Sequence, residues 1–191
     1  MIVVGAQVRD VDAELAARRV PCQRCGASLR PWGFARARLI RSSGSSSRWW
    51  RPRRAACAAC GRTDVLLPSC LLPRRRDDVE VIGTALVAHA GGAGHRKVAL
   101  MVDRPASTVR NWLRAFRTNA ARLAITGSRL HVHLDADADA APIKPSGSTV
   151  IDAVELLARA ARAVVLRLGP RGEVWPLINV MTAGQLLASA P

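Results

Sequence analysis

Two C-x-x-C-G pairs constrain the fold of this chain more than any other feature of its sequence. Cys22 and Cys25 form the first pair, and Cys57 and Cys60 form the second. A gap of two residues lets one tight turn present two sulfurs to the same ion, and the glycine that follows can adopt the positive φ that closes such a turn. Four thiolates at tetrahedral corners, about 2.3 Å from the metal, satisfy Zn²⁺. The spacing therefore predicts one structural zinc ion bound by Cys22, Cys25, Cys57 and Cys60, with no open coordination position.

Other uses of paired cysteines agree less well with the surrounding sequence. A thioredoxin-like redox site needs one pair at the head of a helix in a βαβ unit, and neither pair has such surroundings. The first residues lack the basic segment and long apolar run of a signal peptide, and no stretch is long and apolar enough to span a bilayer. We therefore expect a cytoplasmic protein without a membrane partner, in which disulfides are rare. Cys70 is expected to be a small buried residue outside the zinc site.

The segment between the two pairs predicts a β-hairpin. Residues 30–41 and 48–56 are rich in arginine, aromatic and aliphatic residues, as in strands, and the serine-rich residues 42–47 predict a flexible turn. Pro52 predicts an edge or a bulge in the second strand. Residues 10–20 predict a short amphipathic helix capped by Asp10 or Asp12. Together these features predict a zinc ribbon over residues 1–65.

The formal net charge of the 191-residue chain is +15, and most of the excess lies in residues 1–76, which hold 16 arginines and 4 acidic residues. So uneven a charge favours a polyanionic partner, nucleic acid above all, over the alternative of a solvated basic face. Trp49 and Trp50 could stack on bases, although we expect one of them to cover the small core of the ribbon instead. The arginines predicted to contact a nucleic-acid backbone are Arg51, Arg53, Arg54, Arg74, Arg75 and Arg76.

The middle of the chain predicts helices. Residues 66–76 contain prolines and a basic run, which predict a surface linker. Apolar residues at helical spacing then predict a three-helix domain over residues 77–125, with helices at 77–90, 95–102 and 106–125. The expected inner face consists of Val79, Ile82, Leu86, Val87 and Ala90 in the first helix, and of Val109, Leu113, Phe116, Ala120 and Leu123 in the third.

Residues 95–113, "HRKVALMVDRPASTVRNWL", resemble the helix-turn-helix motif of bacterial DNA-binding proteins. Ala99 matches the small residue that lets the two helices cross closely, and Val109 and Trp112 match buried apolar positions. Asp103 stands where the family usually has glycine in the turn, and Asp tolerates the left-handed conformation better than most residues. The alternative is an ordinary helical hairpin.

The resemblance implies that the N-terminal part of the third helix enters the major groove of DNA. Arg110 and Asn111 have the chemistry for bidentate contacts with guanine and adenine edges, respectively. Residues expected to contact phosphates are Ser107, Thr108, Arg114 and Arg117, which fix the register without reading sequence. A solvated arginine face is the alternative for Arg117.

The order of these parts resembles the N-terminal DNA-binding half of certain insertion-sequence transposases. It is more similar still to a family of short, uncharacterised zinc-ribbon/helix-turn-helix proteins from high-GC bacteria. In the transposases a catalytic domain with three carboxylates follows, and the residues after 125 are too few to form one. The resemblance therefore implies a protein that is not an enzyme.

Residues 126–148 predict a linker. Its segment "HVHLDADADA" contains possible metal ligands, and two kinds of metal site were considered for it. A hydrolase site would use His131, His133 and Asp135 but lacks further distant ligands, and a calcium loop would need glycine and glutamate where Ala140 and Ser146 stand. Residues 149–191 predict a helical appendage with helices at 149–170, ended by Gly169 and Pro170, and at 175–188. The expected inner face of the first is Ile151, Val154, Ala158, Ala161, Val165 and Leu168. These helices could fold back on the domain or pair with another subunit.

The sequence thus predicts an α+β fold, mostly α, with a four-cysteine zinc ribbon, a trihelical helix-turn-helix domain and C-terminal helices. The function expected is sequence-specific binding of double-stranded DNA in the cytoplasm, at the nucleoid, by a transposon-related recognition factor or a transcriptional regulator. The C-terminal helices could serve a homodimer or a separate transposase subunit. The alternative function is an RNA-binding or protein-docking ribbon with the helices as scaffold.

Overall fold

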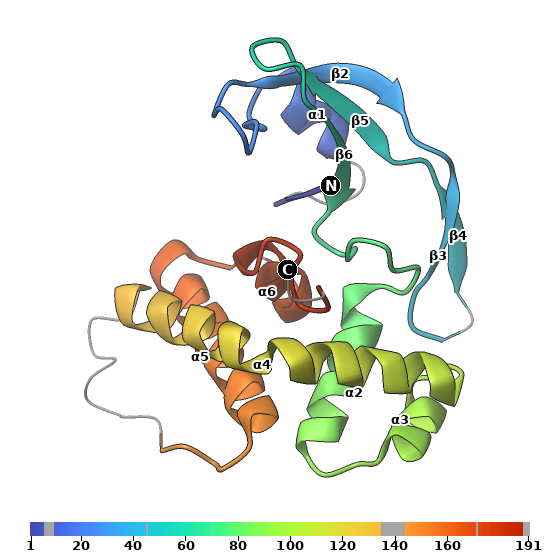
Figure 1. Cartoon of the computed structure of the whole chain (residues 1–191), viewed down its shortest axis with the longest axis vertical. Coiled ribbons are helices and arrows are strands. Elements are labelled where there is room, and N and C mark those ends of the chain that lie inside the picture. Colours follow the sequence, from blue (N-terminus) through green and yellow to red (C-terminus); the bar gives the residue numbers. More distant parts are fainter. Residues whose placement is uncertain (6–9, 45, 135–143, 171, 189–191) are drawn as a thin grey trace.

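The computed structural model describes residues 1–5, 10–44, 46–134, 144–170 and 172–188. Strands fill the first 68 residues around one short helix, and helices fill the rest, so the fold is mixed α and β with helices predominating. In Figure 1 the strands curve over the helices, and the β3–β4 hairpin descends toward the end of the helical layer that contains α3. The strands are β1 (Ile2–Val4), β2 (Leu29–Phe34), β3 (Arg38–Arg41), β4 (Ser47–Trp50), β5 (Arg53–Cys57) and β6 (Thr63–Pro68). The helices are α1 (Val11–Ala16), α2 (Val79–Ala90), α3 (His95–Met101), α4 (Ala106–Leu134), α5 (Thr149–Leu168) and α6 (Val174–Met181).

Four strands form one sheet in the order β1-β6-β5-β2. β5 pairs antiparallel with both β2 and β6, and β1 pairs parallel with β6, so that Ile2 lies opposite Leu66. Sequence reasoning missed β1 because three apolar residues are too few to show a period, and their partner strand lies about 60 residues away. The short helix predicted before the first cysteine pair is present as α1, with Asp10 at its N-cap.

The predicted hairpin forms, but each of its strands is interrupted. Residues 35–37 separate β2 from β3, and residues 51–52 separate β4 from β5. Pro52 lies in the second break, and the β2–β5 pairing is irregular between Pro31 and Phe34. The breaks let β3 and β4 leave the four-stranded sheet as a separate two-stranded ribbon, in which Leu39 lies opposite Trp49.

The surface linker predicted over residues 66–76 is wrong in its first half. Residues 63–68 form β6, and Leu66, Leu67 and Leu71 are fully buried, with Leu72 almost so. The segment is packed rather than solvated because burying its leucines removes apolar surface from water. The prolines at 68 and 73 mark turns within it. Only the arginine run after Pro73 stays at the surface.

Helices α2, α3 and α4 form near the predicted positions. Asp78 caps α2 by accepting a hydrogen bond from the N–H of Glu80, and the predicted inner face of α4 is buried. Val87 is exposed, contrary to the prediction. The predicted linker over 126–148 is also wrong at its start, because α4 continues to Leu134. Asp135 and residues 136–143 lie outside the described residues.

The C-terminal helices fold back on α2 and α4, one of the two arrangements expected. The inner face predicted for α5 is confirmed at Ala161 and wrong at Ile151, Ala158 and Leu168, which are exposed. The buried residues are Val150, Ala153, Leu157, Ala160, Ala161, Ala163 and Val164. The cause is a close crossing at Gly127 of α4, where a Cβ would lie 2.8 Å from the backbone carbonyl carbon of Leu156. Small alanines, rather than the large apolar residues, suit such a contact.

The last helix completes the core of the helical layer. α6 is shorter than the predicted helix at 175–188, and its Trp175 packs on Gly83 of α2, where a Cβ would lie 2.1 Å from the indole ring. The backbone N–H of Trp175 also donates to the Glu80 carboxylate. None of the described helices combines the length and apolarity needed to cross a bilayer.

Buried apolar residues gather in three clusters. One fills the helical layer, and a second lies beneath the four-stranded sheet and includes Cys22 and Cys57. The third joins the other two: Ile40 of β3 packs with Leu67 and Leu71, and Trp50 and Cys70 cover it. The hairpin is thereby seated on the segment that connects the sheet to α2.

Candidate metal centre and candidate nucleic-acid surface

The two cysteine pairs form two turns with the same backbone hydrogen bonds. In the first, the N–H of Cys22 donates to the carbonyl of Ala27, and the N–H of Gly26 donates to the carbonyl of Cys22. In the second, Cys57 pairs with Arg62 and Gly61 with Cys57 in the same way. Gly26 and Gly61 have φ of 75° and 71°, as the sequence predicted for turns of this kind.

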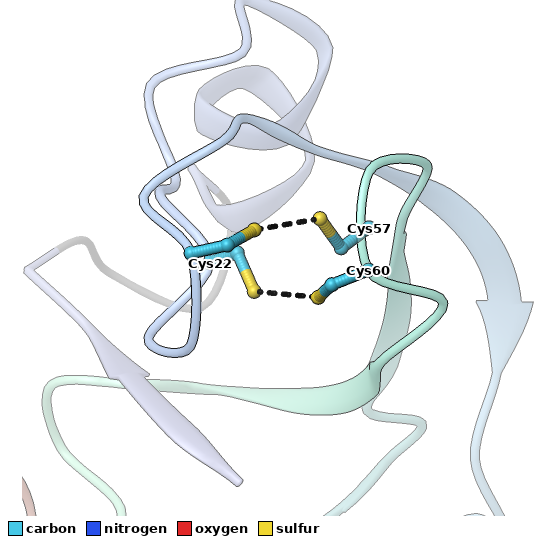
Figure 2. Close-up of side chains that lie close together, drawn as sticks. Cys22, Cys57 and Cys60 are labelled. Carbon is cyan, nitrogen blue, oxygen red and sulfur yellow. Dashed lines mark hydrogen bonds between the residues drawn. The ribbon is translucent and has the colours of Figure 1, made fainter.

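The two turns face each other, so the four sulfurs converge (Figure 2). The Sγ atoms of Cys22 and Cys60 are 3.6 Å apart, those of Cys25 and Cys57 are 3.5 Å apart, and all four lie within 4.8 Å of one another. Ligands at the corners of a tetrahedron with bonds of about 2.3 Å would be separated by about 3.8 Å. The observed spacing is therefore close to what one tetrahedral metal ion requires.

Hydrogen bonds from the backbone lower some of the thiol pKa values, whereas hydrogen bonds among the thiols raise the pKa of Cys25. The backbone N–H groups of Arg24 and Cys25 lower the pKa of Cys22 to about 7, and that of Cys60 lowers the pKa of Cys57. The N–H of Ala27 acts in the same direction on Cys25, but the thiols of Cys57 and Cys60 outweigh it and raise its pKa to about 12. Four thiolates so close together repel one another, so a cation is needed for all of them to ionise.

The four cysteines are positioned to bind a metal ion. Among the described residues they are the one group of three or more His, Cys, Asp or Glu side chains close enough to do so. Cys70 lies outside the group, as predicted, and burial raises the pKa of its thiol to about 11. Of the alternative hydrolase ligands, His131 and His133 lie in the last turn of α4, and Asp135 is outside the described residues.

The turn between α3 and α4 has the hydrogen bonds of a Schellman motif. The N–H of Arg104 donates to the carbonyl of Ala99, and the N–H of Asp103 donates to that of Leu100. Asp103 has φ of 51°, the left-handed conformation expected of it from the sequence. Ala99 and Val109 are buried on either side of this turn, so α3 and α4 pack closely.

The predicted DNA-contacting residues lie together on the N-terminal half of α4. Thr108 is half-buried, and the others are exposed: Ser107, Arg110, Asn111, Arg114 and Arg117. Val109, Trp112, Leu113 and Phe116 are buried on the opposite side of the helix. The half of α4 that follows the turn therefore has one polar, basic face and one apolar face.

The predicted backbone-contacting arginines fall into two groups, the first of which lies around Phe34. The guanidinium groups of Arg51 and Arg53 lie over the ring of Phe34, 5.1 and 4.3 Å from its centre, and Arg53 also pairs with Asp12. Arg54 is half-buried near them, beside the start of the chain.

The remaining three, Arg74, Arg75 and Arg76, line an open groove elsewhere with a volume of about 930 Å³. We call it the arginine groove; its lining residues are Arg36, Ala37, Arg38, Leu39, Trp49, Arg74, Arg75 and Arg76. Sequence reasoning missed Arg36 and Arg38, because only the pairing of β3 with β4 brings them beside Trp49 and the later arginine run. One of the two tryptophans is packed, as expected, but Trp50 packs on the cluster of Ile40, Leu67 and Leu71 rather than on the core beneath the four-stranded sheet, and Trp49 is exposed.

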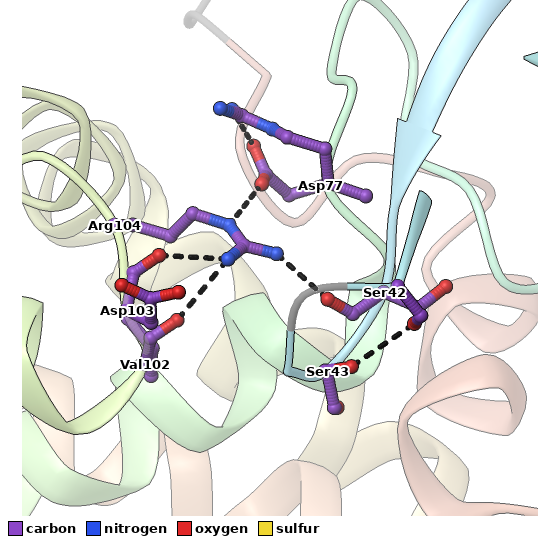
Figure 3. Close-up of polar contacts among 8 residues, drawn as sticks. Ser42, Ser43, Asp77, Val102, Asp103 and Arg104 are labelled. Atoms are coloured by element: carbon purple, nitrogen blue, oxygen red, sulfur yellow. Dashed lines mark hydrogen bonds and ion pairs between the residues drawn. The ribbon is translucent and has the colours of Figure 1, made fainter. Parts of the chain in front are cut away.

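A buried ion-pair network ties the hairpin to the α3–α4 turn (Figure 3). Asp77 accepts hydrogen bonds from Arg104 at 2.7 Å and from Arg41 at 2.8 Å. Arg104 also donates to the backbone carbonyl of Ser42, at the tip of the hairpin, at 2.7 Å. This network holds the hairpin in a set position beside α4, and sequence reasoning did not find any of its members.

Comparison with known protein families found a match over the middle of the chain. Residues 22–112 match a family model described as Domain of unknown function (DUF6431). The matched segment begins at the first cysteine and ends within the exposed basic half of α4. No curated protein and no solved structure matches the chain.

Proposed function

We propose that this protein binds double-stranded DNA in a sequence-specific manner, through a helix-turn-helix formed by α3 and α4 and a structural zinc ribbon formed by the cysteine turns and strands. The observation that carries the proposal is the exposed face of α4 immediately after the Asp103 turn. That face bears Arg110, Asn111 and Arg114 over a fully packed apolar side. The first two turns of the second helix are the part of such a motif that enters the major groove.

The chemistry of this face supports base reading as well as backbone contact. Arg110 can donate two parallel hydrogen bonds to the O6 and N7 of guanine, and Asn111 can pair in bidentate fashion with adenine. Arg114 and Arg117, one and two turns further along, would meet the phosphates, with Ser107 at the start of the helix. Recognition of DNA shape or charge alone would not require an asparagine at position 111 beside Arg110.

A zinc ion is the occupant that best suits the four-cysteine site. Four thiolates without a fifth ligand are typical of structural zinc, and they leave no position open for a substrate. The ion would replace the core that so small a sheet lacks, because the cluster beneath it holds, among the described residues, only eight buried apolar residues besides the ligands Cys22 and Cys57. We therefore assign the centre to stability, and the protein as a whole to a role without catalysis.

The positive charge of the hairpin and its ion pairs with the α3–α4 turn support a joint role of the ribbon and α4 in DNA binding. Because Asp77 joins Arg41 of β3 to Arg104 of the turn, the basic hairpin and the reading helix keep one relative position. The family match spans both cysteine pairs and the start of α4, which supports treating them as one unit. In this proposal the protein acts as a regulator of transcription or as a recognition factor for a separate transposase subunit.

Selection from a random duplex pool tests the proposal. The metal-loaded full chain would be mixed with the pool at 0.1 M salt, and bound duplexes would be amplified and sequenced. We expect one enriched motif, and an affinity for it that falls with rising salt because phosphate contacts release counterions. A pool that stays random after repeated rounds would contradict sequence-specific binding and would favour the RNA-binding or protein-docking function.

A further inference from the structure

The arginine groove is a second concentration of positive charge, separate from the exposed face of α4. Five of its eight lining residues are arginines, and none is acidic: Arg36 and Arg38 come from the hairpin, and Arg74, Arg75 and Arg76 from the segment before α2. Within the described residues, none of the five forms a side-chain ion pair; the nearest acidic residue along the chain, Asp77, is engaged by Arg41 and Arg104. Five clustered cations repel one another, and this repulsion destabilises the groove. An anionic ligand would reduce the repulsion.

Some of the donors in this groove also lack acceptors. The Nε and Nη2 atoms of Arg38 and the Nε atom of Arg75 are shielded from solvent and have no hydrogen-bond partner among the described residues. Burial lowers the pKa of the Arg38 guanidinium, as expected for a cation without a counter-ion. A buried donor without an acceptor is unfavourable, and phosphate oxygens are the acceptors that guanidinium groups match best.

The groove also contains a flat aromatic surface. Trp49 is 74% exposed on β4, in a position where nothing in the apolar clusters covers it. Its neighbour Trp50 packs against the cluster of Ile40, Leu67 and Leu71, and the guanidinium of Arg38 lies over its ring, 5.5 Å from the ring centre. A two-stranded ribbon anchored in this way presents the Trp49 indole on a rigid support.

We propose that the arginine groove binds single-stranded nucleic acid, with an unpaired base stacked on Trp49 and the adjoining phosphates held by the surrounding arginines. An exposed aromatic ring set among cations is the arrangement by which proteins hold unpaired strands, since every base offers a face for stacking. In a duplex the base faces are already stacked, so a duplex would leave the indole unused. This site stands apart from the duplex binding proposed for α4, and either could hold without the other.

The test compares two exposed tryptophans in the full, metal-loaded chain. Trp49→Ala is matched by Trp32→Ala, because Trp32 is 62% exposed on β2 but does not line the groove. Binding of fluorescein-labelled (dT)10 is measured by anisotropy at 0.1 M salt. We expect Trp49→Ala to weaken it about 5- to 150-fold, the loss of one stacked base, whereas Trp32→Ala changes it less than about twofold. Trp49→Phe, which keeps a stacking face, should retain most of the affinity.

Further arms identify the ligand class and separate this inference from the proposed function. Arg76→Ala should reduce the salt dependence of (dT)10 binding by about one released counterion. Trp49→Ala should weaken binding of (dT)10 and leave binding of the selected duplex unaffected. Arg110→Ala should weaken binding of the selected duplex and leave binding of (dT)10 unaffected. Equal affinities of Trp49→Ala and Trp32→Ala for (dT)10 would overturn the inference. So would an equal loss of duplex and single strand in Trp49→Ala, or polyglutamate binding as tight as that of (dT)10.

Discussion

Arg104 and Asp77 form an ion pair with an Nε–Oδ1 distance of 2.7 Å, and their side chains are only 5% and 3% exposed. Arg104 lies in the turn between α3 and α4, whereas Asp77 ends the segment that connects the sheet to α2. Asp77 also accepts from Arg41 of β3, so one carboxylate receives two arginines from different parts of the fold. The pair joins the half of the protein that contains the four-cysteine cluster to the half that bears the exposed α4 face.

Replacing Asp77 should destabilise this junction. Asp77→Asn leaves the Arg104 guanidinium buried without its counter-ion, and removing one partner of a buried pair costs about 3 kcal/mol. Urea unfolding followed by circular dichroism would measure the change in the free energy of unfolding. Glu14→Gln is the matched control, because its pair with Arg19 lies at the surface, where solvent screening leaves it little net stabilisation. Equal losses in the two variants would contradict a structural role for the buried pair.

A methyl group at Gly127 should separate α4 from α5. The Cβ of Gly127→Ala would lie 2.8 Å from a backbone atom of Leu156, which cannot turn aside as a side chain could. We expect a loss of about 1–3 kcal/mol in the free energy of unfolding, the usual cost of overpacking. Gly91→Ala provides the control: its φ is −75° and its nearest neighbours lie at 3.5 Å or more, so its stability should be unchanged or slightly higher. A Gly127→Ala variant as stable as the parent would mean that the helices do not cross this closely.

Removing one sulfur should release the metal and unfold the sheet. Cys57→Ser lacks one of the four ligands, so we expect less than stoichiometric zinc by elemental analysis and loss of protection of the strand amides in hydrogen exchange. The helical layer should persist, because its buried cluster contains none of the cysteines. Cys70→Ser is the control and should keep one ion per chain. Native protection of the strands in a metal-free Cys57→Ser protein would argue against a structural metal.

Truncating Arg110 should weaken DNA binding and relax its specificity. The loss of a bidentate contact with guanine is worth about 1–3 kcal/mol at a selected site, and preference for one base pair should disappear. Arg129→Ala is the control, since Arg129 is an exposed arginine of the same helix more than five turns away. Anisotropy with the selected duplex and with a scrambled duplex measures both effects. A loss of equal size on the two duplexes would assign Arg110 to the phosphate backbone instead.

Features that depend on the spacing of neighbouring residues could be predicted from the sequence alone. The spacing within each cysteine pair and the glycine after it are local signals for a turn that presents two sulfurs. The meeting of the two turns was predicted from ligand count, because one structural zinc ion takes four thiolates and each pair supplies two. The apolar period of α4 likewise identified Val109, Leu113 and Phe116 as its buried side. Asp103 was expected in the left-handed region because it stands where the helix-turn-helix motif that this segment resembles usually has glycine, and its φ is 51°.

Contacts between distant segments could not be recognised in this way, because nothing local encodes the partner. β1 is a strand only through its pairing with β6, and Ile151 of α5 is exposed because the close approach at Gly127 selects the alanine side of that helix. Arg38 and Trp49 meet Arg75 only once the hairpin is seated on the leucines before α2. Local geometry and periodicity thus specified the metal centre and the helices, whereas packing free energy, summed over residues far apart in the chain, set the junction at Asp77 and the groove beside it.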